Sequence, residues 1–222
     1  MRKNGFSTYG IIGLGRFGLA VAEELIKLGK NVIALDKDQS RLRSLQDTSA
    51  DAYVIEEVSK EAFIDAGLED ADVIIIGIGK DIESNILAAL NAKEMGAERV
   101  IAKATSEDHA KILEKIGAEV IFPEVDIGNR LAKRLSSALA EDILPLSEDF
   151  SIIQIKVPES LTGKTIVEVN LRKKYGVNVI ATIIDGKANG VIEPETMLSS
   201  DMALVISGSN KGLDAMQRDL SR

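Results

Sequence analysis

The chain has 222 residues, of which 45% are hydrophobic and 28% are charged, with a net charge of −8. This balance indicates a globular protein of one or two domains, and it argues against disorder and against nucleic acid or a bare anionic membrane as partner. Cysteine is absent, which excludes disulfides and thiolate chemistry. We expect no signal peptide, and the most apolar run, residues 73–79, is too short to cross a bilayer.

Short apolar runs alternate with helical patterns along the first two-thirds of the chain. Strands are expected at residues 9–14, 31–36, 51–55, 72–78, 99–104 and 119–122, and helices at 16–28, 39–46, 60–66, 82–95 and 107–116. The strands are rich in Val and Ile, as is typical of parallel strands covered on both faces. This order predicts an α/β fold, a Rossmann-like doubly wound parallel sheet.

Two finer patterns support these helices. Phe17, Val21, Leu25 and Leu28 recur on one stripe of the first helix, which we expect to be its buried face. Glycine stands where C-terminal caps belong, at positions 29, 67, 96 and 117.

A long amphipathic helix is expected over residues 126–142, where apolar side chains recur every four residues from Ile127 to Ile143. Two interpretations stay open. The helix either closes the parallel sheet or crosses to a second subunit.

The last third of the chain has a different pattern. Pro145 breaks the helix, and residues 143–150 are expected to be a linker between a first domain, 1–142, and a second, 151–222. The second domain is expected to be a small α+β unit, with strands at 151–157, 177–184 and 203–207 and helices at 165–174 and 211–220.

The glycines of the first strand–helix turn follow the pattern Gly13-x-Gly15-x-x-Gly18. In a dinucleotide-binding turn the first glycine allows the sharp bend, the second leaves room for a pyrophosphate, and the third lets the helix pack against the sheet. The N–H groups at the start of the helix then bind the phosphates. Because the pattern follows a strand and opens a helix, we interpret it as a nucleotide site.

Two charged residues refine this site. Asp36 ends the second strand, where a carboxylate binds a ribose diol; the alternative is a cap for the next helix, for which Asp38 is the better candidate. Arg16 would add charge-assisted bonds to the phosphates; its alternative is a solvated arginine in the first helical turn.

Several segments together resemble the RCK proteins, the cytosolic regulatory subunits of Ktr/Trk-type potassium uptake systems. They are "GIIGLGRFG" at 10–18, "VIAKA" at 100–104, "LEKIGAEVIFPEVDIG" at 113–128 and "LRKKYGVNVIA" at 171–181. The glycine turn is more similar to the Ktr type than to the NAD-associated Trk type. The resemblance spans nearly the whole chain and both expected domains.

The resemblance implies a function and a location. Dimers would assemble into a ring, an octamer, docked on the inner face of the cell membrane beneath an integral membrane potassium channel or transporter. ATP would favour the active shape of the ring and ADP the inactive one, with NAD(H) as an alternative ligand. The chain itself would be cytoplasmic and peripheral to the membrane.

The resemblance also implies a set of ligand-binding residues. The nucleotide set is Gly13, Gly15, Arg16, Phe17, Gly18, Asp36, Lys37, Ile78, Gly79, Lys103 and Glu124. Glu124 matches a family glutamate that holds Mg²⁺ or another cation near the γ-phosphate; the alternative is a carboxylate at the start of a helix. The family often has Asn/Asp-Ala-Thr after the third strand, where this chain has residues 56–59, "EEVS", so the base contact departs from the pattern.

In the second domain, family members often bind cyclic di-AMP. The matching residues here are Val167, Arg172, Asn178 and Ile192. Arg172 has an alternative role as a cap of a short helix. Asp185 falls where a basic residue would suit a phosphate better.

Two other functions compete with that of a regulatory subunit that senses a nucleotide. An NAD-dependent oxidoreductase needs a group that moves a proton, usually histidine. The sole histidine, His109, falls on the polar side of its helix and is expected at the surface. We therefore expect no enzyme. A free-standing nucleotide-binding scaffold without a membrane partner stays open.

Overall fold

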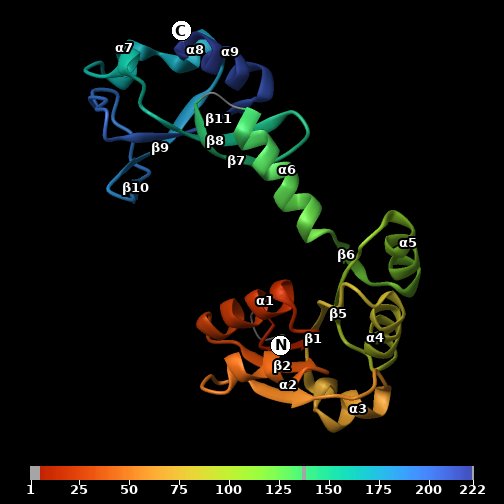
Figure 1. Cartoon of the computed structure of the whole chain (residues 1–222). Helices are drawn as coiled ribbons and strands as arrows, with labels where there is room; N and C mark the ends of the chain where they lie inside the picture. Colours follow the sequence, from red (N-terminus) through yellow and green to blue (C-terminus); the bar gives the residue numbers. More distant parts are fainter. Residues whose placement is uncertain (1–5, 137–138, 222) are drawn as a thin grey trace, which may run out of the picture. The chain divides into compact units, whose positions relative to one another are not determined.

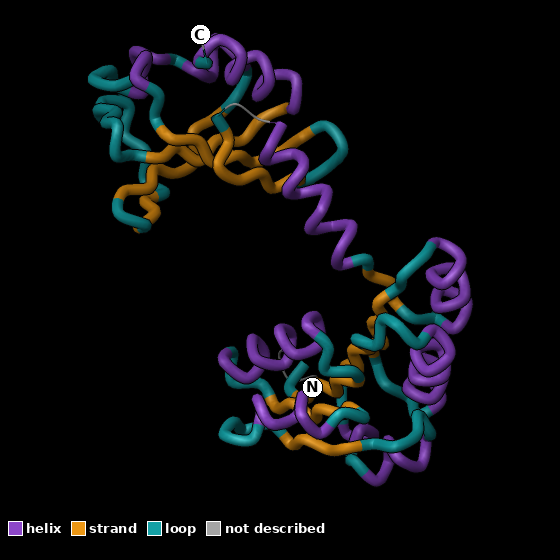
Figure 2. The backbone as a smooth tube through the Cα atoms, viewed as in Figure 1, coloured by secondary structure: helices purple, strands orange, loops and turns teal. Residues whose placement is uncertain are grey.

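Two sheets organise the chain, which is represented by a computed structural model that describes residues 6–136 and 139–221 (Figure 1). One sheet belongs to a first unit, Met1–Pro123, and the other to a second unit, Glu124–Arg222. Both sheets are drawn in orange in Figure 2. Within the described ranges, no helix is long and apolar enough to span a membrane.

The first sheet has six parallel strands in the order β3-β2-β1-β4-β5-β6. Their bounds are β1 Thr8–Ile12, β2 Asn31–Asp36, β3 Asp51–Val54, β4 Val73–Ile76, β5 Arg99–Lys103 and β6 Glu119–Ile121. The chain starts in the centre, builds outward through β2 and β3, and returns to the other side of β1 for β4. Such a reversal leaves a crevice at the carboxyl ends of the strands, which is where open α/β sheets bind ligands. The predicted fold class is confirmed.

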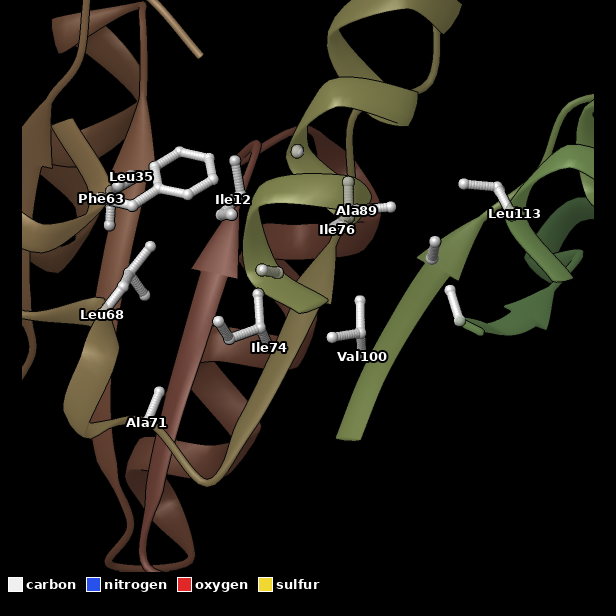
Figure 3. Close-up of a cluster of buried hydrophobic side chains, with 14 of the residues drawn as sticks. Ile12, Leu35, Phe63, Leu68, Ala71, Ile74, Ile76, Ala89, Val100 and Leu113 are labelled. Atoms are coloured by element: carbon white, nitrogen blue, oxygen red, sulfur yellow. The ribbon is translucent and has the colours of Figure 1, made fainter. Parts of the chain in front are cut away.

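Helices cover both faces of this sheet: α1 Arg16–Lys27, α2 Gln39–Leu42, α3 Lys60–Asp65, α4 Ile82–Glu94 and α5 Glu107–Ile116. Side chains alternate along each strand, so Ile12, Ile74 and Ile76 join the core under α3, α4 and α5, while Ile11 and Ile75 join the core on the other face. Figure 3 shows the first of these cores, with Phe63, Ala89 and Leu113 around the strands. Burial on both faces explains the Val- and Ile-rich strands.

The glycines predicted at the helix C-termini are confirmed, and one residue of the predicted buried stripe of α1 is not. Gly117 is the C-cap of α5 in the left-handed conformation, at φ +87°, and the other three predicted cap glycines also have positive φ. Leu28, expected on the buried stripe of the first helix, is 64% exposed. It lies beyond the last residue of α1, so the helical period no longer directs its side chain toward the core.

The second unit has a five-stranded antiparallel sheet in the order β10-β9-β11-β8-β7. Its strands are β7 Ala140–Pro145, β8 Phe150–Lys156, β9 Asn178–Ile184, β10 Lys187–Asn189 and β11 Ala203–Ser209, and its further helices are α7 Ile166–Val169, α8 Leu171–Tyr175 and α9 Asn210–Leu220. The single helix expected at 165–174 is two helices, because Asn170 between them takes the left-handed conformation at φ +50°.

The junction between the two domains differs from the prediction. The long helix is α6, Pro123–Ser136, and the predicted helical residues 137–138 lie outside the described residues. Residues 140–145 form β7, which pairs with β8, so the expected linker at 143–150 is the end of β7, the turn that follows it and the first residue of β8. β7 is an edge strand, where a terminal proline is tolerated. The units divide after Pro123 rather than after residue 142.

The apolar side chains of α6 are uncovered in the single chain. Ile127, Leu131 and Leu135 are 66%, 43% and 74% exposed. A bidentate pair, Arg130 with Asp142, joins α6 to β7 at 3.2 and 2.6 Å.

Candidate nucleotide site

The turn after β1 is built from backbone. Gly13 bends the chain at φ +91°, and its N–H donates to the carbonyl of Leu35 at 2.8 Å. Gly15 is the N-cap of α1, no side chain caps the helix, and its first turn holds no acidic residue. The N-terminus of this helix therefore presents N–H groups and partial positive charge to an anion.

The glycines of the turn have separate roles. A Cβ on Gly18 would collide with the carbonyl oxygen of Gly13, so Gly18 lets α1 approach β1. A Cβ on Gly15 would meet nothing within 4 Å, so this position leaves space beside the turn. Gly77, absent from the predicted set, packs like Gly18: its Cβ would lie 2.6 Å from the Gly13 oxygen. The pattern Gly77-x-Gly79 was the feature of the sequence from which this role of Gly77 could have been predicted.

Asp36 lies at the end of β2 with only 4% of its surface exposed. Its carboxylate accepts from the backbone N–H of Leu14 at 2.6 Å and from that of Asp38 at 2.8 Å, and it pairs with Arg41 at 3.2 Å. Asp38 caps α2 by accepting from the N–H of Ser40, as predicted, so Asp36 is not that cap. Sequence reasoning missed Arg41, whose position five residues beyond Asp36 gave no signal.

Three further predicted residues, Arg16, Phe17 and Lys37, lie near the turn in different environments. Arg16 is exposed on the first turn of α1. The side chain of Phe17 is half-buried and packs against the core on the α1 face, which leaves its backbone for a ligand. Lys37 is exposed and lies close to Asp81: hydrogen bonds from Ser84 lower the pKa of Asp81, and the charge of Lys37 lowers it further.

The other side of the crevice is formed by the segments after β4 and β5. The Nζ atom of Lys103 lies 3.5 Å from where a Cβ on Gly79 would be, so this half-buried side chain reaches the predicted strand end at Ile78 and Gly79. Asn85 on α4 joins the same segments, since its Nδ2 donates to the carbonyls of Ile78 at 2.6 Å and Lys103 at 3.1 Å. Asn85 was not predicted as a site residue.

His109 is buried, with 3% of its surface exposed, and the prediction of a surface position was wrong. Its Nε2 lies 3.1 Å from Oδ1 of Asn85. His109 lies on the same helical stripe as Leu113 and Ile116, four and seven residues later, so the helical period in fact favours its burial. A buried amide on α4 provides the polar partner that periodicity does not reveal.

Glu124 lies in the first turn of α6, in the second unit, and is exposed. It is thus the one predicted nucleotide residue outside the first unit. Within the described part of the chain, no group of three or more His, Cys, Asp or Glu side chains is placed to hold a metal ion.

The residues predicted to bind a second messenger are on the second unit. Val167 on α7, Arg172 on α8 and Asn178 at the start of β9 are exposed, and Ile192 is half-buried. The N–H of Val167 donates to the carbonyl of Pro194 at 2.9 Å, which places α7 beside the segment that contains Ile192.

Asp185 has a structural role in this unit. Asp185 and Gly186 have φ of +49° and +73° between the paired strands β9 and β10. Positive φ at both central residues is typical of a tight hairpin turn, for which an Asp-Gly pair is well suited. The acidic residue at this position is therefore explained by the turn.

The parallel sheet, the glycine turn at its switch point and the carboxylate at the end of β2 define the Rossmann-like class of nucleotide-binding folds. The chain belongs to the TrkA family: residues 9–124 match the TrkA-N domain and residues 151–221 match the TrkA-C domain.

Its relatives include potassium uptake proteins. Ktr system potassium uptake protein A of Vibrio alginolyticus is 35% identical over 205 residues, 92% of this chain and 90% of that protein. Ktr system potassium uptake protein C of Bacillus subtilis is 32% identical over 197 residues, 86% and 89% of the two chains.

Solved structures share the fold. The RCK domain of GsuK matches with a TM-score of 0.68 at 17% identity, over 100% of this chain and 49% of that one. The GsuK channel bound to NAD matches with a TM-score of 0.66 at 16% identity, over 100% of this chain and 40% of that one.

Proposed function

We propose that this chain is a regulatory subunit of a potassium uptake system that binds ATP or ADP between the ends of β1 and β2. The observation that carries the proposal is the open space at Gly15 beside the uncapped start of α1, with the buried carboxylate of Asp36 at the neighbouring strand end. Phosphates suit the first feature and a ribose diol the second. The Ktr relatives supply the physiological setting.

The nucleotide acts as a signal in this proposal. A hydrogen bond to a charged group contributes about 1.5–3 kcal/mol, so one contact from Arg16 to a γ-phosphate, made in one subunit arrangement only, biases each site by roughly 12- to 150-fold. No proton transfer is needed. His109 supports a sensor over an oxidoreductase, because both ring nitrogens already have partners within the fold.

The choice of nucleotide is part of the proposal. The GsuK channel, which shares the fold, has been solved bound to NAD, and 59% of this chain resembles GsuK bound to ADP at 24% identity with a TM-score of 0.50. We favour ATP and ADP, with NAD(H) as the alternative ligand and Mg²⁺ as a companion of ATP.

Assembly and location complete the proposal. Dimers of this chain form an octameric ring that docks on an integral membrane potassium transporter subunit from the cytoplasm, and nucleotide exchange changes the shape of the ring. The exposed side chains of Val167 and Arg172 on the second unit are the proposed contacts for cyclic di-AMP.

Thermal unfolding tests the ligand. The purified chain is heated with ATP, ADP, NAD, NADH and cyclic di-AMP, each with and without Mg²⁺. A nucleotide at 100 times its Kd stabilises the folded state by about 2.7 kcal/mol. We expect ATP and ADP to raise the midpoint for the wild type and not for Gly15→Val. No shift with any adenine nucleotide would overturn the proposal, and NADH turnover abolished by Arg16→Ala would favour an oxidoreductase.

A further inference from the structure

A buried polar pair, Asn85 and His109, lies behind the strand ends of the proposed site. Asn85 has no exposed surface and His109 has 3%. Through its two bonds to the carbonyls of Ile78 and Lys103, the amide of Asn85 sets the spacing between the segments that follow β4 and β5. Those segments contain the predicted nucleotide contacts on this side of the crevice. One side chain of α4 therefore links the two segments on this side of the proposed site.

The hydrogen bonds assign the protonation state of the imidazole. The nitrogen of Asn85 donates to two carbonyls, so its oxygen is the acceptor, and Nε2 of His109 at 3.1 Å must donate to it. Nδ1 is then an acceptor. It lies 3.4 Å from the backbone N of Thr105 and 3.3 Å from the hydroxyl of the same residue.

A second proton on the ring disrupts this arrangement. It would be added at Nδ1, where it would turn an acceptor into a donor that faces the N–H of Thr105. The hydroxyl of Thr105 can rotate to accept from the new N–H, but the backbone N–H of Thr105 loses its acceptor and faces a second donor, which favours a shift of Thr105. Thr105 follows Lys103 by two residues, and the displacement therefore reaches the end of β5 and the carbonyl that Asn85 holds.

The surroundings of His109 keep the ring neutral at neutral pH. Burial lowers its pKa below the ordinary 6.5. Asn85 and Thr105, whose side chains lie within hydrogen-bonding distance of the ring, are uncharged. The elements around it are α4, β5, α5 and β6, and their charged groups are Glu83, Lys93, Glu94, Arg99, Lys103, Glu107, Asp108, Lys111, Glu114, Lys115 and Glu119. Except for the half-buried Lys93 and Lys103, these are exposed and screened by water.

We propose that Asn85 and His109 are positioning residues for the nucleotide site, and that protonation of His109 weakens nucleotide binding. The inference rests on the nucleotide site proposed above and adds its regulation by pH. Binding linkage is reciprocal, so a nucleotide that disfavours the protonated ring must also lower the proton affinity of His109 by the same factor. Each pKa unit of coupling corresponds to about a tenfold change in Kd.

Because the chain contains one histidine, this linkage can be measured without mutation. The full chain is purified through a tag that lacks histidine and labelled with ¹³Cε1-histidine, which gives a single imidazole resonance. Its titration is recorded with and without saturating ADP. We expect the midpoint to fall by at least ~0.5 unit on ADP binding, or roughly threefold in affinity. An unchanged or raised midpoint, or a ring that never titrates before the protein unfolds, overturns the inference.

A variant separates this result from the proposed function. His109→Gln keeps an amide donor near the Nε2 position and removes the titration. Calorimetric Kd values for ADP are compared between pH 8 and pH 5.5 for both proteins. Dividing the change in Kd of the wild type by that of the variant cancels the effect of the titration of ADP itself. We expect acid to weaken binding at least threefold more in the wild type. Identical pH profiles overturn the inference alone, whereas no ADP binding at pH 8 overturns the nucleotide site and the inference with it.

Discussion

The carboxylate of Asp36 accepts a hydrogen bond of 2.6 Å from the backbone N–H of Leu14, the residue between the first two glycines of the turn. One side chain thus joins the end of β2 to the turn that follows β1. The group proposed to bind ribose also maintains the shape of the glycine turn, so the two halves of the proposed nucleotide site are joined by a hydrogen bond within the fold.

Asp36→Ala should therefore affect folding and binding together. The variant leaves the N–H of Leu14 without its buried acceptor, which costs about 1–3 kcal/mol of unfolding free energy. Urea unfolding followed by circular dichroism measures this change. Asp47→Ala, at an exposed carboxylate, is the matched control and should be within ~0.5 kcal/mol of wild type. An unfolding free energy equal to that of the control would refute the structural role of Asp36.

Gly15→Val should abolish ATP binding with little effect on folding. The space around a Cβ at Gly15 is open, so the new side chain meets no protein atom near its base and occupies the proposed phosphate position. Calorimetry and thermal unfolding measure the two effects. Gly18→Ala is the contrasting variant, because its Cβ collides with the Gly13 carbonyl, and it should lose stability. Tight ATP binding by Gly15→Val would show that the site is misplaced.

Arg16→Ala should weaken ATP binding more than ADP binding, because its proposed partner is the γ-phosphate. The expected difference is roughly 12- to 150-fold, the equivalent of one charged hydrogen bond. Lys27→Ala, at an exposed basic residue near the other end of α1, should change neither affinity. Equal losses for ATP and ADP would contradict γ-phosphate sensing.

Gly77→Ala should destabilise the first unit through backbone packing alone. The new Cβ would lie 2.6 Å from the Gly13 oxygen and 3.3 Å from the Cα of Gly18, and such overpacking typically costs about 1–3 kcal/mol. Gly128→Ala, a position with open space in α6, should instead be neutral or slightly stabilising. Wild-type stability of Gly77→Ala in urea would mean that the turn tolerates displacement.

Acid should loosen α6 from β7. The hydrogen bonds from Arg130 hold the pKa of Asp142 below its ordinary 3.8, so the pair contributes stability above that pH and loses it as the pH falls below. Asp142→Asn should reduce hydrogen-exchange protection of α6 at pH 7. At pH 3 the variant and the wild type should approach each other. A gap that is equally large at both pH values would mean that the carboxylate charge is irrelevant.

The elements of the first unit were predictable because each has a local cause. The run of apolar residues at β4 is buried on both faces, and the capping residues of α4 and α5, Asp81 and Ser106, are adjacent in sequence to the helices they start. The glycine turn was recognisable for the same reason. Its function depends on the spacing of three residues within one strand–helix connection.

The errors occurred where distant residues decide the outcome. Strand β7 forms because it pairs with β8. The sequence of residues 140–145 contains Pro145, which argues against a strand. His109 was expected at the surface although it shares a helical stripe with Leu113, and its buried polar partner, Asn85, lies 24 residues earlier in the sequence. Gly77 is required by the Gly13 carbonyl in the turn that follows the neighbouring strand, β1.

The order of residues alone determined the doubly wound sheet, the glycine turn and the family to which the chain belongs, since hydrophobic period and glycine spacing act over a few neighbouring residues. Only the tertiary structure showed that Asp36 accepts a hydrogen bond from the glycine turn. It alone also showed that Asn85, paired with His109, joins the ends of β4 and β5. Those relationships depend on atoms brought into contact by folding, and a buried hydrogen bond between distant segments leaves no periodic trace in the sequence.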